Sequence, residues 1–326
     1  ADQQIALANR GGSVRIYLYT CGIPQGSTLG PLLFLLYIND LPNSSSKFSF
    51  RIFADDTNMF FSSNSSSELE SVVNNELQLV LKYCASNKLS VNFKKTNYML
   101  ISSSRKSVHI NVDNIARKPF VKYLGIYIDE HLNWEPQTLH INSKLAKNIG
   151  ILYKVRNYVD LNVLKQLYYT LIYPYLNYGI MSWGNACKTR LKRLQTKQNQ
   201  CIRCIFFANK RENAKIYYAL LEVLELNNIY KMKIGLFAHK IQNDKNSIPA
   251  VFSDTLTPVS EIHCHHTRYA SRKNFYRINT STRYGQSTFQ FSASKIWESV
   301  SVSLKSLPYN SFKKHYKQYL LTTQNN

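Results

Sequence analysis

The sequence has few acidic residues for its size. Only 19 aspartates and glutamates stand against 41 lysines and arginines, so the 326 residues carry a formal net charge of +22. The excess is uneven: residues 1–139 hold a net +2 (13 basic, 11 acidic), residues 140–259 a net +12 (18 and 6) and residues 260–326 a net +8 (10 and 2). Such a positive balance favours a polyanionic partner, with nucleic acid ahead of a membrane surface.

Cysteine and long apolar runs are scarce as well. Six scattered cysteines do not form a disulfide framework and fit reduced thiols in an intracellular setting. No secretory signal precedes the first motif, and the apolar run Leu32–Ile38 is far shorter than the roughly 20 residues that span a bilayer. We therefore expect no membrane partner. Because the sequence opens at Ala1 without a methionine, we also expect a fragment or a processed piece.

Two adjacent carboxylates lie in the stretch RIFADDTNMFF, Arg51 to Phe61. Before them, apolar residues from Phe48 onward alternate with polar ones, which is the period-2 pattern of a strand with one buried face. A strand that enters and a strand that leaves predict a β-hairpin with Asp55 and Asp56 at its tip, where water or a metal ion can reach them. A merely solvated turn is the alternative, because aspartate is common in turns.

Strand and helix patterns are mixed up to about residue 135. A strand is expected at residues 14–18, and a loop rich in Gly and Pro (22–30) leads into a helix whose residues 32–38 are apolar on every side, as expected for a buried helix. An apolar face over residues 69–84, with Ser67 and Glu70 at capping-box spacing, predicts a second helix. Further strands are expected at 89–93, 98–101, 108–112 and 121–128. The mixture predicts an α+β fold, with helices packed against a sheet.

After Trp134 the pattern is helical only. Apolar residues at helical spacing predict helices around 145–152, between Asp160 and Pro174, and at 191–205, 214–223, 229–240 and 311–321. The tail after residue 260 is basic, with interleaved tyrosines such as Tyr269 and Tyr276. We therefore expect a helical domain followed by a basic tail.

The segment GIPQGSTLGPLLFLLYINDLP (residues 22–42), followed by FADD, resembles the reverse transcriptases of non-LTR (LINE-type) retrotransposons of the jockey, CR1 and RTE kind. The likeness continues through KYLGIYI and the helical stretches into the tail. It implies a partial reverse-transcriptase palm with an antiparallel sheet (1–135), a mainly helical thumb (136–250) and a basic C-terminal region (251–326). It covers nearly all of this chain but only the C-terminal half of the family's enzyme.

The resemblance also implies the residues of the metal and nucleotide sites. Asp55 and Asp56 would be catalytic ligands of Mg²⁺ (or Mn²⁺), because oxygen ligands on a rigid turn suit a hard cation that keeps several waters. Two adjacent carboxylates are also unfavourable without a cation, since their negative charges repel each other. The turn Pro24-Gln25-Gly26 would lie beneath the incoming nucleotide and the template base, with a plain helix-entry loop as the alternative.

Two further family motifs follow the carboxylates. Lys95, in LSVNFKKT, would be catalytic by protonating the pyrophosphate leaving group or stabilising its charge, although adjacent lysines on a turn are often just solvated. Tyr123, Leu124 and Gly125, in KYLGIYI, would form the hairpin that grips the primer terminus, with Gly125 allowing close backbone approach. An ordinary core strand explains the apolar residues of this segment equally well.

Basic residues crowd one expected helix of the thumb. With almost no acid nearby, they suit contact with the phosphates of an RNA template and an RNA–DNA duplex, alongside deoxynucleoside triphosphates as substrates. A solvated basic face is the alternative. The proposed nucleic-acid-binding residues are Lys188, Arg190, Lys192, Arg193, Lys197 and Arg203.

Two arrangements of possible zinc ligands are weak. Cys201 and Cys204 have helical i, i+3 spacing without a second pair, which favours cysteines of the thumb core. Residues 263–266 (HCHH) are dense in ligands, but adjacent residues do not easily close one tetrahedron around zinc. We expect no zinc at either place.

The family's third metal-binding aspartate and its fingers have no counterpart here. That aspartate lies well upstream of the Pro-Gln-Gly turn in the family pattern, and Asp2 is the sole acid before Pro24. Three interpretations stay open: a piece of an active RNA-directed DNA polymerase, an inactive nucleic-acid-binding remnant, and a structural relic without a partner. We expect this chain alone to be inactive, and its parent to work in the nucleus, where target-primed integration takes place.

Overall fold

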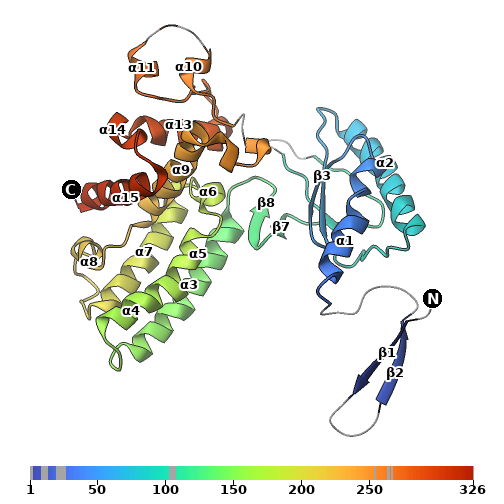
Figure 1. Cartoon of the computed structure of the whole chain (residues 1–326), viewed down its shortest axis with the longest axis horizontal. Helices are drawn as coiled ribbons and strands as arrows, with labels where there is room; N and C mark the ends of the chain where they lie inside the picture. Colours follow the sequence, from blue (N-terminus) through green and yellow to red (C-terminus); the bar gives the residue numbers. More distant parts are fainter. Residues whose placement is uncertain are drawn as a thin grey trace. The chain divides into compact units, whose positions relative to one another are not determined.

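The structure is a computed structural model that describes residues 3–8, 14–19, 27–102, 108–252, 255–262, 265 and 267–325, the first two ranges by their backbone alone. Residue contacts divide the chain into two compact units, Ala1–Lys118 and Pro119–Asn326 (Figure 1). The division therefore precedes the hairpin around residue 124, which the sequence analysis assigned to the palm. That hairpin packs with the helices that follow it.

The N-terminal unit holds most of the strands, and each described sheet in it has two strands. Three short pairings replace the single palm sheet expected from the resemblance, and one of them, β5 with β6, is parallel. In chain order the elements are β1 (Gln3–Ala8), β2 (Val14–Tyr19), α1 (Gly30–Ile38), η1 (Leu41–Ser44), β3 (Ser49–Phe53), β4 (Asp56–Phe60), α2 (Ser66–Ser86), β5 (Asn97–Tyr98) and β6 (Ala116–Arg117).

A small core joins the β3–β4 hairpin to α1 and α2. Phe50 is buried and Ile52 half-buried, while the residues between and beside them are exposed, so the alternation seen in the sequence does give one buried face. The buried members of this core are Ile38, Leu41, Phe50, Val80 and Cys84. Helix α2 starts two residues earlier than its Ser67 suggested, because Ser65 accepts the hydrogen bond from the backbone N–H of Glu68.

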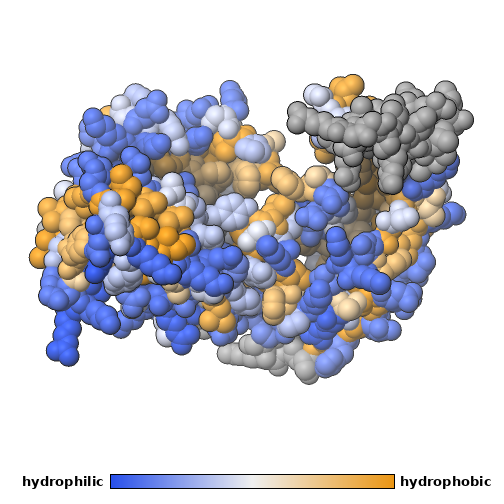
Figure 2. Space-filling view, turned by 90° about the horizontal axis from the view of Figure 1, so that it is seen from below, coloured by the Kyte–Doolittle hydropathy of each residue, from blue (hydrophilic) through white to orange (hydrophobic). Residues whose placement is uncertain are grey.

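Helix α1 is less buried than its composition predicted. Phe34 packs against the core and Ile38 is buried, but Leu32 and Leu36 are 55% and 65% exposed. The expectation of a helix buried on every side is therefore wrong for this chain, because the described residues cover only one side of α1. Apolar surface of this kind recurs elsewhere, and Figure 2 shows orange apolar areas interrupted by blue hydrophilic residues on the face in view.

Two of the expected strands are not strands. Residues 89–93 form coil and a turn, from which Leu89 and Val91 pack on the core, so their alternation reflects burial without a pairing partner. Residues 108–112 are held by a helix side chain instead of a neighbouring strand: Asn74 Nδ2 donates to Asn111 O at 2.9 Å, and Asp113 N donates to Asn74 Oδ1 at 3.0 Å. A strand pattern in the sequence cannot reveal such a partner.

The second unit begins with a hairpin and continues as packed helices. Residues 121–128, predicted as a single strand, form this hairpin. A C-terminal series of short and long helices follows the main bundle. Its first elements are β7 (Phe120–Tyr123), β8 (Ile126–Asp129), α3 (Glu135–Val155), α4 (Leu161–Leu167), the π-helix η2 (Tyr168–Ile172), α5 (Tyr173–Asn177), α6 (Ile180–Trp183), α7 (Lys188–Ile205), α8 (Lys215–Leu221) and α9 (Leu226–Asn243). Its last are η3 (Lys245–Ser247), η4 (Ala250–Phe252), α10 (Val259–Ile262), α11 (Arg268–Ser271), α12 (Arg283–Gln286), α13 (Phe289–Glu298), α14 (Val302–Lys305) and α15 (Tyr309–Asn325).

Pro174 does not end its helix as the sequence suggested. A proline has no N–H, and here the chain passes through the π-helical turn η2, where Tyr173 N–H donates to Tyr168 O, before α5 continues to Asn177. Asp160 does begin the preceding helix, because its carboxylate accepts from Val163 N at 2.8 Å. The predicted helix is thus real but longer.

One core runs through the whole second unit. Helix α3 packs on α7, and α9 carries both α13 and α15. Phe275, Trp297 and Phe312 are fully buried in the same core as the bundle residues. The region after residue 250, expected as a basic tail, is therefore an integral layer of the helical unit (Figure 1). The mixture of helices and strands confirms the coarse α+β class. Among the described residues, every helix is too short or too polar to span a bilayer.

Candidate functional site

The two adjacent carboxylates lie at the tip of a tight β-hairpin, as predicted. Strands β3 and β4 are antiparallel with Phe53 opposite Asp56, so only Ala54 and Asp55 form the loop. Ala54 has a φ of +50°, a left-handed conformation that disfavours residues with a Cβ. The core behind the hairpin holds both strands in place, so the sequence fixes the carboxylates at a strained, exposed turn.

Both carboxylates are solvent-exposed and uncompensated. Within the described part of the chain, the carboxylates of Asp55 and Asp56 neither accept a hydrogen bond nor form an ion pair. The nearby Arg51 turns elsewhere, since its Nη1 donates to Phe50 O at 2.7 Å and to Ser49 Oγ at 3.1 Å. Two neighbouring negative charges without a protein cation form a set of oxygen donors open to a divalent ion from solvent.

No third ligand joins this pair in the described residues. Nowhere in them do three or more His, Cys, Asp or Glu residues gather in an arrangement that could hold a metal ion. Lys95 is exposed, and its backbone N–H donates to Asn92 O at 3.0 Å in the turn after Val91; no described interaction joins it to the hairpin tip. The predicted Pro24-Gln25-Gly26 turn lies outside the described residues.

The predicted primer-grip residues form the turn of the second unit's hairpin. Tyr123 pairs with Ile126, which leaves Leu124 and Gly125 as the loop, with φ values of +45° and +82°. Positive φ at both positions is the pattern of a type I′ turn, which matches the twist of the flanking strands. Gly125 is thus required by the turn itself, whatever approaches it.

Helices of the second unit hold this turn in place. Tyr178 Oη donates to Leu124 O at 2.6 Å, and Tyr127 N donates to Gln137 Oε1 at 3.0 Å. After the hairpin, the carboxylate of Asp129 accepts from the backbone of Asn133 and Trp134, so this acid is structural. Sequence reasoning missed Tyr178 and Gln137, because nothing in their local pattern signals a partner many residues away.

The proposed basic residues of α7 divide into two groups. Arg190 is committed to the fold, with Nη2 2.8 Å from Glu135 Oε2 and Nη1 2.9 Å from Asn133 O. Arg203 Nε likewise donates to Glu212 O at 2.8 Å, and half-buried Lys197 donates to Gln200 at 3.3 Å. The remaining three are exposed and have i, i+4, i+5 spacing along one side of the helix. We call Lys188, Lys192 and Arg193 the α7 basic face.

The Cys-x-x-Cys pair of the same helix is part of the core, as the spacing suggested. Cys201 and Cys204 are both buried and free. Burial raises the pKa of both thiols, and the guanidinium of Arg156 offsets only part of this for Cys204. Protonated thiols are poor metal ligands. Of residues 263–266, only His265 belongs to the described part, so the second zinc prediction stays untested.

Comparisons with known proteins agree with the motifs. Residues 5–128 match the family described as reverse transcriptase (RNA-dependent DNA polymerase). In sequence, the chain is similar to the RNA-directed DNA polymerases of non-LTR retrotransposons. It is 27% identical over 194 residues to a probable RNA-directed DNA polymerase from transposon X-element of Drosophila melanogaster, covering 56% of this chain and 21% of that protein. It is 29% identical over 199 residues to the counterpart from transposon BS of the same organism, covering 56% and 22%.

A third relative is matched over more of both chains. The Pol polyprotein from the type-1 retrotransposable element R1 2 of Nasonia vitripennis is 25% identical over 254 residues, or 69% of this chain and 60% of that protein. This chain thus spans about a fifth of the length of the first two transposon polymerases. No solved structure matches it. The β3–β4 hairpin with its carboxylates lies wholly inside the family match, and α7 lies outside it.

Proposed function

We propose that this chain is part of an RNA-directed DNA polymerase of a non-LTR retrotransposon, with its metal-binding hairpin in the N-terminal unit and a nucleic-acid-binding surface in the helical unit. The observation that carries the proposal is the exposed, unpaired Asp55 and Asp56 at the tip of β3–β4, inside the segment that matches the reverse transcriptase family. The parent protein would copy an RNA template with deoxynucleoside triphosphates as substrates, in the nucleus.

The donor set fits one Mg²⁺. Magnesium is held in many sites by one or two carboxylates together with waters and substrate phosphates, and Asp55 and Asp56 supply the carboxylates from adjacent positions. When bound, the ion would neutralise charge on a triphosphate. Exposure of both side chains leaves room for waters and substrate oxygens around the ion. Lys95, on its exposed turn, would contribute positive charge toward the same phosphates.

The helical unit would hold the duplex. The α7 basic face offers three exposed cations that have no partner among the described residues, and residues 140–259 carry a net charge of +12. Phosphate contacts of this kind position a duplex without reading its sequence. The turn at Leu124 and Gly125, fixed by Tyr178, would meet the primer backbone, because an exposed glycine allows close approach.

The chain alone is expected not to polymerise. A second metal ion needs a further carboxylate, and the described residues gather no third ligand. Losing a metal removes several kcal/mol of transition-state stabilisation, and each 1.36 kcal/mol is about tenfold in rate. The test is primer extension on an RNA template with Mg²⁺ or Mn²⁺, with the Asp55→Ala, Asp56→Ala double variant as background. Extension above that background would show that the chain is sufficient and that no further carboxylate is needed.

A second candidate function is nucleic-acid binding without catalysis. It is favoured by the same α7 basic face, which does not depend on the carboxylates. The two functions separate in one experiment: add the upstream part of a parent protein in trans to the primer-extension assay. Activity that appears with the intact chain and disappears with the double variant supports the polymerase, whereas duplex binding without any extension supports the remnant.

A further inference from the structure

Two neighbouring cavities lie in the C-terminal layer of the helical unit, and none of the residues proposed above for metal, nucleotide, primer or duplex binding lines them. The first, of about 380 Å³, is lined by Arg277, Ile278, Asn279, Phe291 and Lys295. The second, of about 330 Å³, is lined by Val259, Ile262, Tyr269, Tyr276 and Arg277. Both volumes lie in the usual range of ligand pockets, about 300–1,000 Å³. Arg277 is the one residue that lines both.

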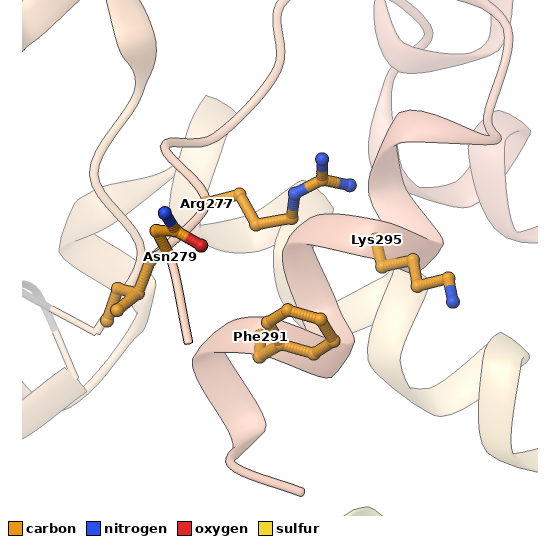
Figure 3. A pocket seen from close by; sticks show the side chains of 5 residues that line it. Arg277, Asn279, Phe291 and Lys295 are labelled. Atoms are coloured by element: carbon orange, nitrogen blue, oxygen red, sulfur yellow. The ribbon is translucent and has the colours of Figure 1, made fainter. Parts of the chain in front are cut away.

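The walls of each cavity combine an aromatic ring with the same cation. In the first, Phe291 and Lys295 lie one turn apart on α13, and Arg277 and Asn279 come from the extended segment that faces the helix (Figure 3). In the second, Tyr276 is 52% exposed, so its ring is accessible. A flat ring beside a guanidinium suits a ligand with a flat base and a phosphate.

Arg277 keeps donors for such a phosphate. Its Nη1 lies 3.3 Å from Glu298 Oε2, and both side chains are about half exposed, so the pair is weak. A guanidinium has five N–H donors, and this contact uses one nitrogen of the fork. The carboxylate of Glu298 orients the guanidinium and leaves its other N–H donors available to a phosphate. Glu298 is one of only 2 acids among residues 260–326, against 10 basic residues, so the surroundings remain positive.

We propose that the two cavities take two consecutive nucleotides of a single-stranded nucleic acid, with Arg277 on the phosphate between them. One base would stack on Phe291 and the next on Tyr276. A duplex does not fit, because its bases already stack on each other and cannot present a face to protein rings. The inference rests on the proposed nucleic-acid function and names a separate surface for unpaired template or product strand.

The test is binding of fluorescein-labelled oligo(U), oligo(dT) and an RNA–DNA duplex, measured by fluorescence anisotropy. Tyr276→Leu and Phe291→Leu each remove a ring without changing charge. We expect each to weaken single-strand binding about 5- to 150-fold and to leave duplex binding unchanged. Comparing oligo(U) with oligo(dT) shows whether RNA or DNA is the occupant.

Matched controls separate this site from general effects. Tyr158→Leu removes a tyrosine that is 85% exposed and outside both cavities, and it should bind like the wild type. Arg277→Gln should lower the salt slope of single-strand binding by about 0.7, and Lys314→Gln, an exposed lysine of α15, should not. Circular dichroism checks that each variant is folded, and Tyr276 is the safer position because its side chain is exposed.

The outcomes are distinguishable. Unchanged single-strand affinity in both ring variants overturns the two-nucleotide site and leaves the proposed function standing. A parallel loss of duplex binding in the ring variants overturns the two-nucleotide site as well, because the effect would not be specific for unpaired bases. A wild-type chain that binds none of the three probes overturns the proposed function together with this inference.

Discussion

Single residues in this protein show how burial changes chemistry. Lys305 is fully buried; its Nζ donates to Asn274 Oδ1 at 2.7 Å and to Arg272 O at 3.1 Å, and lies 5.2 Å from the centre of the Trp297 ring. Burial, partly offset by the charge of Glu298, lowers the pKa of Lys305 to about 8. The lysine ties α14 to the segment before Phe275 without an ion pair inside the core.

Lys305 makes stability depend on pH in a defined direction. Between pH 8 and about 10.5 the unfolded chain still holds the proton that the folded chain has lost, so the free energy of unfolding rises with pH. Over the whole window this amounts to about 3 kcal/mol. Buried cysteine thiols act in the opposite direction: the folded chain keeps their protons to a higher pH than the unfolded chain does, so they lower the free energy of unfolding as pH rises. The difference in unfolding free energy between wild type and Lys305→Met, from urea titrations at pH 7.5 and 9.5, isolates the lysine. A difference independent of pH would contradict its lowered pKa.

Glycines of the second unit offer a paired stability test. Gly125 has φ +82°, and a Cβ there would lie 3.3 Å from Tyr178 Cε1, whereas a Cβ at Gly150 in α3 meets nothing within 4 Å. Gly125→Ala should therefore destabilise the unit by about 1–2 kcal/mol. Gly150→Ala should stabilise it by up to about 1 kcal/mol, because alanine is the better helix former. Thermal unfolding measures both, and equal effects at the two positions would refute the assigned turn.

At the scale of elements, α7 separates charges that serve the fold from charges that face solvent. Replacing the α7 basic face by glutamine should reduce the slope of log K against log salt for an RNA–DNA duplex by about 0.9 per lost phosphate contact. Lys313, Lys314 and Lys317 of α15 give a triple-glutamine control of equal net charge. If the control flattens the slope as much, the effect is one of net charge and α7 is not the binding surface.

Arg190→Gln should instead lower the stability of the helical unit, since it breaks the contact with Glu135.

The sequence could predict elements whose signal is local. Periodicity located α3, α7 and α9, and the alternation before Asp55 predicted both the hairpin and its tip. The predictions that failed concern contacts with residues far away in the sequence. Asn74 holds residues 111–113, and Glu135 binds Arg190 across 55 positions. The cavities around Arg277 were equally hidden, because one forms where α13 meets a segment without regular structure and the other where α10 and α11 meet the same segment. Burial of α1 was predicted wrongly because composition shows that a side chain is apolar, and not whether anything covers it.

At the scale of the whole molecule, the two compact units should unfold separately. The core of the N-terminal unit is small, whereas that of the helical unit runs from α3 to α15. All 3 tryptophans of the chain, at positions 134, 183 and 297, belong to the helical unit. Tryptophan fluorescence therefore reports that unit alone, and far-ultraviolet circular dichroism reports both. We expect the dichroism curve in urea to begin its transition earlier. Superimposable curves would show a single cooperative molecule.

The central claim is that the β3–β4 tip holds a divalent metal ion. Iron(II) can replace Mg²⁺ in such sites, and with ascorbate and peroxide it generates radicals that cleave the chain beside the ion. We expect cleavage within residues 49–60, suppressed by excess Mg²⁺ and abolished in the Asp55→Asn, Asp56→Asn double variant. Asp113→Asn, an exposed aspartate of the same unit, should cleave like the wild type. Cleavage that persists unchanged in the double variant, or that is lost equally in the control, would contradict the account.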